Sequence, residues 1–264
     1  MNVKKYFISA SDVKKRTSID RRVYAFNLAL LALCIFATFY AMFANSSYDF
    51  HWDSVLAYKQ KFIDGFLMTI VISFFALILS FVIGVFFAYG QNSKFILLRF
   101  FSRFYIEVIR GTPLLVQLLI FFYVFAHNLG LDNRYVAGVV ILALFSGAYV
   151  SEIVRAAVQS IGQEQFEIAR ALAMSNYQMY RHIIFPQAFK IMLPSLAGQF
   201  ASIIKDSSLL SIISISEFTM NAQEVNAYTY STLESYIPLA IGYLALTYPI
   251  SYYANRLEKN IKSN

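Results

Sequence analysis

The chain has 264 residues, of which 58% are hydrophobic and 14% are charged, and its formal net charge is +7. Charged residues make up about a quarter of an ordinary soluble domain, so this composition excludes a water-soluble globular protein. The positive charge alone would suit a nucleic-acid partner, but in a membrane protein lysine and arginine first report topology, and we expect no nucleic acid.

Five stretches lack any Asp, Glu, Lys or Arg, and each has close to the roughly 20 residues that a helix needs to cross a bilayer. They are residues 23–44, 65–93, 111–131, 135–151 and 235–255. A sixth span is expected from Pro186 to about Leu210, because Pro186 can open a helix and Lys190 is the one charge before Lys205. The first stretch is too long for the apolar region of a signal peptide, so we expect a retained helix. The sequence predicts an all-α, polytopic membrane helix bundle of about six transmembrane helices.

Basic residues are strongly biased toward one side of these spans. With the N-terminus in the cytoplasm, 18 of the 22 Lys and Arg residues fall on the cytoplasmic side. Cytoplasmic loops of membrane proteins carry such an excess. We therefore predict a multi-pass protein of the inner (plasma) membrane, surrounded by membrane lipid, with both termini in the cytoplasm. The cytoplasmic tails are expected at 1–22 and 258–264, and a longer outer stretch at 211–235.

The cytoplasmic segment 163–186 is predicted to be helical, since it is rich in good helix formers and lacks Gly and Pro before its last residue. Small and aromatic residues recur there at spacings of three and four, which places them on one stripe of a helix. They are Phe166, Ala169, Ala173, Tyr177 and Tyr180. Such a stripe can seat in a groove on another protein, but tyrosine and arginine also favour lipid headgroups. Periodicity leaves both interpretations open.

The spacing in this segment resembles the E-A-A-x3-G-x9-I-x-L-P coupling loop of ATP-binding-cassette (ABC) importer permeases. The matching residues are Glu167, Ile168, Ala169, Ala173, Ile183, Phe185 and Pro186. Ile168, Ala173 and Phe185 stand where the family pattern has Ala, Gly and Leu. Because alanine lacks the freedom of glycine to adopt positive φ, alanine at residue 173 favours a sharp break between two short helices less than the glycine of the family pattern does.

Three further motifs resemble the polar-amino-acid branch of this family. They are the sequences RGTPLLVQ at 110–117, EIVR at 152–155 and KDSSL at 205–209. The resemblance covers about residues 61–257 and implies a type I ABC importer transmembrane domain there, with the helix at 23–44 as an addition. It implies import of a polar amino acid across the inner membrane.

The resemblance also implies partners. These are an ABC ATPase subunit, a periplasmic or extracellular solute-binding protein, and a second permease copy or a paralogue. In the family the leading Glu of the loop, here Glu167, is associated with coupling to the ATPase. The chain has no G-x4-G-K-[ST] sequence, so ATP hydrolysis would belong to a separate subunit and we do not expect an enzyme. No cofactor is expected, and no metal site either, because the His residues show no ligand spacing.

Three charged residues are candidates for the solute path: Glu152, Lys205 and Asp206. An ionisable side chain inside the bilayer costs about 2.5–3.5 kcal/mol unless it has a partner or a water-filled path. Glu152 could receive the amino group of the solute or could pair only with Arg155, and the sequence leaves both open. Lys205 and Asp206 are adjacent and point in different directions, so at least one needs another partner. For this pair we favour helix packing near the outer mouth over solute contact.

A secondary transporter of small polar solutes is the main alternative, since it too would be all-helical with few buried charges. It would usually show a longer chain or paired halves with interrupted helices at matching positions, and this sequence shows neither. A membrane enzyme is less favoured, because no H-E-x-x-H or G-x-S-x-G sequence is present.

Overall fold

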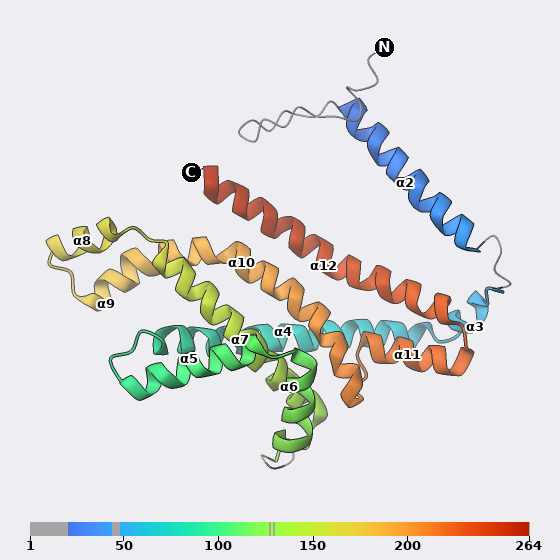
Figure 1. The fold of residues 1–264 in the computed structure, drawn as a ribbon, viewed down its shortest axis with the longest axis horizontal. Helices are drawn as coiled ribbons and strands as arrows, with labels where there is room; N and C mark the ends of the chain where they lie inside the picture. Colours follow the sequence, from blue (N-terminus) through green and yellow to red (C-terminus); the bar gives the residue numbers. More distant parts are fainter. Residues whose placement is uncertain (1–20, 44–47, 127, 129, 264) are drawn as a thin grey trace. The chain divides into compact units, whose positions relative to one another are not determined.

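The computed structural model describes residues 21–43, 48–126, 128 and 130–263, and every regular element within those ranges is a helix (Figure 1). The all-α fold class is therefore confirmed. The chain divides into two compact units, residues 1–50 and 51–264. The first unit holds α2 (Arg21–Phe43), which occupies the range of the expected additional helix. Nearly all of the expected tail 1–22 lies outside the described residues.

Two long helices that pack along much of their length form the centre of the second unit, α4 (Lys59–Gly90) and α7 (Arg134–Gln159). Small residues allow this close approach. A Cβ placed on Gly84 would lie 2.5 Å from Val150 Cγ1, and one placed on Gly147 would lie 2.6 Å from Ile83 Cγ2. Small residues are typical of membrane helix interfaces, where van der Waals contact between close backbones replaces the hydrophobic driving force.

Between α4 and α7 the chain forms α5 (Ile96–Gly111), α6 (Leu114–Ile120) and the π-helix η1 (Phe121–Ala126). α5 meets the α6–η1 stretch at an angle of 113°. Thr112 and Pro113 are extended at the bend, because proline has no N–H to donate and disfavours helical backbone in the residue before it. The predicted span at 111–131 therefore begins at a sharp bend.

Two more long helices, α10 (Phe185–Asp206) and α12 (Thr232–Ser263), pack against each other, and α10 also packs on α7. Between them lie the 3-10 helix η3 (Ser207–Ile213) and α11 (Phe218–Thr229), which packs on α4. The predicted outer stretch at 211–235 is thus largely helical and packed. The expected tail at 258–264 is also helical as far as Ser263, because α12 continues through it.

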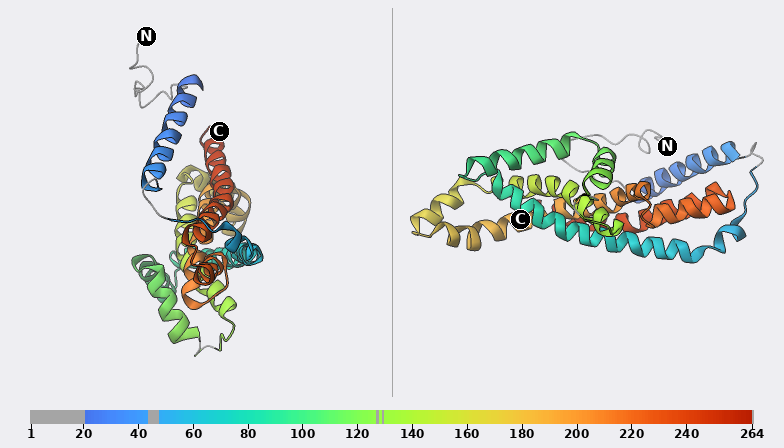
Figure 2. Two further views of the ribbon diagram at one scale, coloured as in Figure 1. Left: turned by 90° about the vertical axis from the view of Figure 1, so that its right-hand side faces the viewer. Right: turned by 90° about the horizontal axis from the view of Figure 1, so that it is seen from below.

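The connection from α7 to α10 contains α8 (Gln163–Ala171), α9 (Asn176–Met179) and the π-helix η2 (Tyr180–Ile184). Figures 1 and 2 show α8 and α9 at one end of the second unit and α3 (Trp52–Leu56) at the other. The largest core cluster lies between these ends, where α4, α6, α7, α10 and η3 meet. Its fully buried side chains include Ile72, Leu118, Leu142, Ile203 and Leu210.

By length and apolar composition, three helices in the described ranges could cross a membrane: α2, α4 and α7. The bent pair of α5 with α6–η1 makes a fourth if it is counted as one span. The predicted spans at 186–210 and 235–255 correspond to α10 and α12, which have 22 and 32 residues. Both are long enough to cross, but they carry more polar and charged residues, so composition alone supports fewer than the six predicted spans.

Candidate coupling and solute-path sites

The predicted coupling segment 163–186 is broken into short helices. α8 ends at Ala171, and Ala173 adopts a left-handed conformation with φ of 54° before α9 begins at Asn176. The expectation of a continuous helix is therefore wrong. The stripe of small and aromatic residues is divided among α8, the turn at Ala173, and the α9–η2 stretch, which runs in a different direction from α8 (Figure 1).

Local hydrogen bonds stabilise the break. Ala173 N–H donates to Arg170 O at 2.9 Å and Met174 N–H donates to Ala169 O at 3.1 Å, which is the pattern of a Schellman motif at the end of α8. The Ser175 side chain then caps α9 in a capping box. These bonds outweigh the cost of about 1–2 kcal/mol that an L-residue carries in the left-handed region. The chain thus bends sharply at Ala173, the position at which the family pattern has glycine.

One face of the segment is anchored to the long helices through a second core cluster. Ala169, Met179 and Ile184 are buried there together with residues of α7 and α10. Phe166 packs against the same cluster, and its ring lies edge-on to that of Tyr180 with centroids 6.4 Å apart. Ala169 is 0% exposed. It therefore holds α8 in place and cannot touch another protein, which corrects its prediction as a coupling contact.

The opposite face of the segment is exposed and carries large side chains. Four residues predicted for coupling are exposed: Glu167, Ala173, Tyr177 and Tyr180. Ile168 and Leu172 are 52% and 68% exposed as well, and sequence analysis missed both. Their spacing of four residues was the available signal, because it places two apolar side chains together on one side of α8 and its C-cap, Leu172. Exposed apolar side chains grouped in this way are typical of a protein-docking surface.

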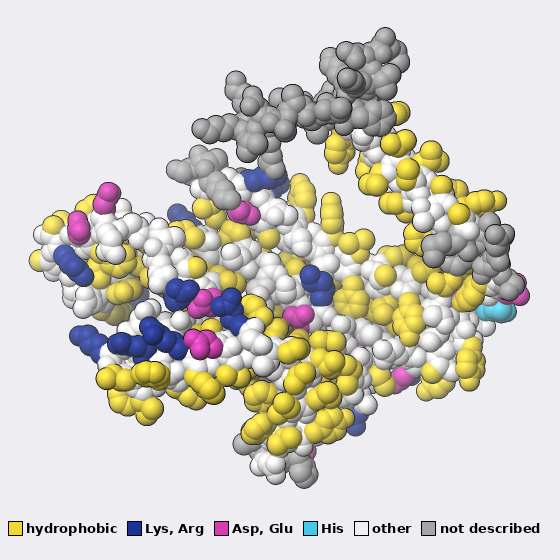
Figure 3. All heavy atoms as spheres, viewed as in Figure 1, with side chains coloured by type: hydrophobic (Ala, Val, Ile, Leu, Met, Phe, Trp, Pro, Cys, Tyr) yellow, Lys and Arg dark blue, Asp and Glu magenta, His cyan; other side chains and the backbone are white. Residues whose placement is uncertain are grey.

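Charged side chains gather toward the same end of the second unit. In Figure 3, Lys, Arg, Asp and Glu side chains cluster between α5 and α8, whereas hydrophobic side chains cover α6. Charged groups need water or partners, while a lipid-facing surface is apolar. The end that carries α8 and α9 is therefore the end suited to an aqueous compartment.

Glu152, on α7, lies in a network that reaches the C-terminal ends of α4 and α5. Its carboxylate accepts hydrogen bonds from the Arg155 guanidinium at 2.7 and 2.9 Å and from Gln91 Nε2 at 3.2 Å. Arg110, near the end of α5, places Nη1 3.4 Å from the same carboxylate. Of the two roles that the sequence left open for Glu152, the structure favours pairing with Arg155, and it adds partners from α5 and from the cap of α4.

Lys205 and Asp206 lie at the C-terminal end of α10, where Lys205 is exposed and Asp206 is half-buried. Within the described part of the chain, neither side chain makes a hydrogen bond or an ion pair. The helix-packing role that we favoured for this pair stays a prediction. The described residues contain no group of three or more His, Cys, Asp or Glu side chains that could hold a metal ion.

A buried carboxylate to which the sequence assigned no role, Glu217, connects three helices. It caps α11 by accepting the N–H groups of Thr219 (2.9 Å) and Met220 (2.8 Å), and the Tyr243 hydroxyl of α12 donates to it at 2.9 Å. The hydroxyl of Thr69 on α4 lies 3.5 Å away. Glutamate is not among the residues that usually cap helices, so the sequence offered no signal for this cap. The arrangement fixes α11 against α4 and α12.

A protein-family profile described as "Binding-protein-dependent transport system inner membrane component" matches residues 80–263. The match includes the whole coupling segment and covers more than half of the chain. The chain belongs to this family. Its recognition as an ABC importer permease, a membrane subunit with a type I importer transmembrane domain, is therefore confirmed.

Individual relatives agree with this assignment. The chain is 37% identical over 203 residues to a putative glutamine transport system permease protein of Rickettsia typhi, covering 76% of this chain and 93% of the relative. It is 34% identical over 217 residues to the glutamine transport system permease protein of Escherichia coli K12, covering 81% of this chain and 99% of the relative. A crystal structure of an amino acid ABC transporter with histidines superposes with a TM-score of 0.74 at 35% identity, covering 81% of this chain and 100% of that one.

Proposed function

We propose that this permease imports a polar amino acid, with glutamine as the first candidate, and that a separate ABC ATPase supplies the energy. The observation that carries the proposal is the two-faced coupling segment. Its inner face is locked to α7 and α10 by fully buried side chains, and its outer face presents a carboxylate with apolar and aromatic groups. Glutamine is named for several relatives of the chain.

The exposed outer face of the coupling segment explains how a movement of the ATPase on nucleotide binding would reach the membrane helices. We infer that Glu167, Ile168, Leu172, Tyr177 and Tyr180 fit a groove on the ATPase. Close packing transmits displacement because the interior has little free volume. A shift of α8 and α9 would therefore move the inner ends of α7 and α10, which share the cluster around Ala169.

The same proposal fixes an orientation. The end with α8 and α9 faces the cytoplasm, α3 and the start of α4 face outward, and both termini are cytoplasmic, in agreement with the bias of the basic residues. The transporter domain is proposed at 61–257, with an additional membrane helix at 23–44 and tails at 1–22 and 258–264. α10 and α12 would also cross the membrane, because their polar side chains can face a path rather than lipid.

The remaining partners are proposed from the family. A second copy of the chain or a paralogue would complete the solute path, and a solute-binding protein would dock on the outer end. Lys205 and Asp206, at the end of α10 without partners in the described residues, are proposed to face this path. Glu152 would fix the surrounding helices through Arg155.

Copurification tests the ATPase assignment. The tagged permease, expressed with its cognate ATPase, should retain the ATPase in mild detergent, and Glu167→Lys should lose it, because the substitution reverses the charge on the exposed docking face. Retention of the ATPase by Glu167→Lys would contradict the coupling assignment.

Glu107→Lys is a matched control for this test. Glu107 is also exposed and lies on α5 rather than on the coupling segment. The same charge reversal at this position should leave the ATPase bound. Uptake of labelled glutamine into proteoliposomes that contain the binding protein tests the solute. Uptake that proceeds without ATP would instead favour a secondary transporter.

A further inference from the structure

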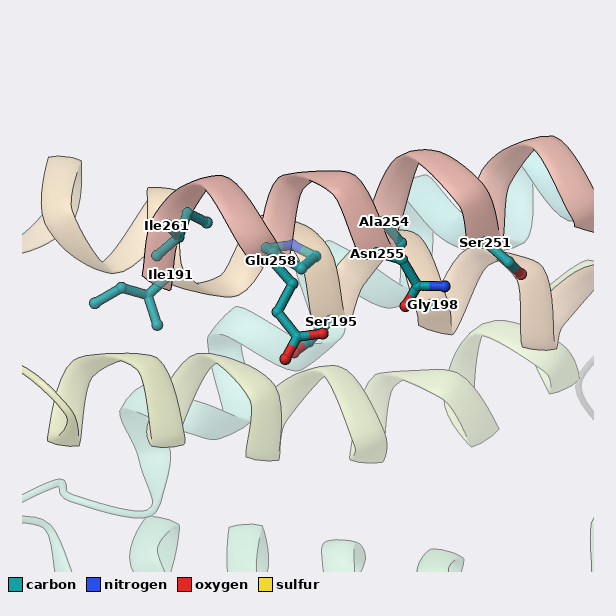
Figure 4. Close-up of a pocket in the computed structure, with 9 residues that line it drawn as sticks. Ile191, Ser195, Gly198, Ser251, Ala254, Asn255, Glu258 and Ile261 are labelled. Atoms are coloured by element: carbon teal, nitrogen blue, oxygen red, sulfur yellow. The ribbon is translucent and has the colours of Figure 1, made fainter. Parts of the chain in front are cut away.

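A groove between α10 and α12 and the surface of α5 both carry charged side chains outside the coupling segment. The groove has a volume of about 570 Å³, and Ser195, Asn255 and Glu258 project from it to the same side of the helix pair (Figure 4). Glu258 already has an interaction partner, so its charge is not free for a ligand. On the α5 surface, by contrast, two exposed basic side chains make no hydrogen bond or ion pair within the described residues. They are Lys94, just before the helix, and Arg103.

α5 has three distinct sides, and the first is buried against the long helices. Ser102, Ile106 and Ile109 are buried there, and the ring of Tyr105 stacks on that of Phe87 of α4 with centroids 3.9 Å apart. Positions three and four residues apart fall on the same side of a helix, so these residues form one continuous packed side. The packing holds α5 against α4 and α7 in one rotation about its axis, which decides where its other side chains point.

The second side of α5 is exposed and apolar. It consists of Leu97, Phe100, Phe101, Phe104 and Val108, which are 42–69% exposed. With a rise of about 1.5 Å per residue, these positions cover about 16 Å along the helix axis, which is about half of a hydrocarbon core of roughly 30 Å. α5 then ends at the bend of 113°. The apolar side therefore has the length of one lipid leaflet, and lipid tails are the surroundings that it matches.

The third side of α5 is basic and borders the apolar side. Arg99 and Arg103 lie one helical turn apart, and Phe100 lies three residues before Arg103, so basic and apolar groups are neighbours on the helix surface. Arg99 donates from Nε and Nη2 to Ser93 O at 2.9 and 2.6 Å, which directs its guanidinium toward the turn that carries Lys94. Three positive charges thus gather at the start of α5.

The other charged residues of α5 do not neutralise this cluster. Glu107 lies one turn beyond Arg103, and in the described structure no ion pair joins the two. Arg110, at the far end of the helix, is engaged with Glu152 at 3.4 Å. The start of α5 therefore combines uncompensated positive charge with an adjoining apolar surface. A ligand that satisfies both needs an anionic group attached to apolar chains.

We propose that Lys94, Arg99 and Arg103 bind the phosphate of an anionic phospholipid whose acyl chains lie along the phenylalanine side of α5. A guanidinium can donate two hydrogen bonds to a phosphate, and side chains one turn apart can reach the same headgroup. Free phosphate or an acidic protein surface would match the basic side alone. A zwitterionic headgroup would bring an ammonium group into the cluster, so a lipid with net negative charge is favoured. On the orientation proposed above, this lipid belongs to the cytoplasmic leaflet.

Lipid binding to the full-length permease tests this inference. Purified permease in mild detergent would be titrated with phosphatidylglycerol or with phosphatidylethanolamine of the same acyl chains, and native mass spectrometry would count the bound lipid. Phosphatidylglycerol should bind at least about fivefold more tightly. Arg103→Gln should weaken its binding about fivefold, and Arg99→Gln combined with Arg103→Gln about 25-fold, since each basic residue near an anionic headgroup contributes a factor of about that size. Binding of phosphatidylethanolamine should change by less than about twofold.

Two further variants separate headgroup binding from effects of net charge or folding. Arg170→Gln removes the same charge from an exposed position on α8 and should leave the affinity for phosphatidylglycerol within about twofold of the wild type, because distant exposed charges are screened. Glu107→Gln removes the carboxylate one turn beyond Arg103 and should strengthen binding, because that carboxylate repels the phosphate. A structural defect in α5 would weaken binding in both Arg103→Gln and Glu107→Gln, and weaker binding in Glu107→Gln would therefore contradict the headgroup site.

Other results would also overturn the inference. Equal affinity of the wild type for the two lipids, or equal losses in Arg103→Gln and Arg170→Gln, would remove the headgroup site from α5. Glycerol phosphate lacks acyl chains, so its displacing phosphatidylglycerol at equal concentration would assign the cluster to free phosphate. Loss of a copurifying ATPase in Arg103→Gln with unchanged lipid binding would assign it to a protein partner. The lipid titration contains neither ATP nor solute, so its result does not depend on the ATPase and solute assignments.

Discussion

Ala173→Gly is the substitution that most directly tests how the coupling segment bends. Alanine at φ of 54° carries about 1–2 kcal/mol of steric cost that glycine avoids. Glycine in turn loses more conformational entropy on ordering, about 0.5–1 kcal/mol. The side chain of Ala173 is exposed, so no packing is lost. Ala173→Gly should therefore stabilise the bent conformation by about 0.5–1 kcal/mol, which shifts the equilibrium roughly twofold to fivefold toward it.

Hydrogen exchange measures this shift directly. The N–H of Met174 donates within the Schellman motif, so its exchange in the nanodisc-embedded permease should slow by about twofold to fivefold in Ala173→Gly. Ala171→Gly is the matched control, since Ala171 is equally exposed but helical, and there glycine should destabilise the segment by up to about 1 kcal/mol. Exchange that is unchanged or faster in Ala173→Gly would refute the strain argument.

Three further predictions concern packing and charge, and thermal unfolding of the purified permease measures each. Gly84→Ala should lower the free energy of unfolding by about 1–3 kcal/mol, because the added methyl group would overlap a side chain of α7. Gly198→Ala is the control and should be tolerated, since nothing lies within 4 Å of the added Cβ. Similar losses of stability in the two variants would argue against close packing of α4 on α7. Glu217→Ala should lower the free energy of unfolding by about 1–2 kcal/mol, since it removes the cap of α11 and one hydrogen bond of the Tyr243 hydroxyl, which keeps its bond with Thr219; an unchanged midpoint would contradict this. Glu152→Gln and Arg155→Gln should each lower the free energy of unfolding by about 1 kcal/mol or less. The double variant should lose about 0.5 kcal/mol less than the sum of the two single losses. Strictly additive losses would show that the two side chains act independently.

Local sequence patterns were sufficient for some features of this protein and misleading for others. Long uncharged stretches located α2, α4 and α7, because the need to cross a bilayer is imposed by composition and length. They missed the first turns of α4 and the last two turns of α7, where charged residues extend the helices beyond the uncharged stretch. The family spacing from Glu167 to Pro186 located the coupling segment. Helix propensity within that segment suggested one helix. Propensity does not include the hydrogen bonds of the Schellman motif and the Ser175 cap, which stabilise the bend at Ala173.

The amino-acid sequence by itself determined that the chain is a helical membrane protein, and its motifs identified the family, because both depend on residue type and spacing along the chain. Only the tertiary structure decided which residues face one another. It buried Ala169 and exposed Ile168 one residue away, gave Glu152 a partner on α5, and turned one side of α10 into a polar groove with α12. Those outcomes depend on contacts between helices that are far apart in sequence, and no local pattern carries that information.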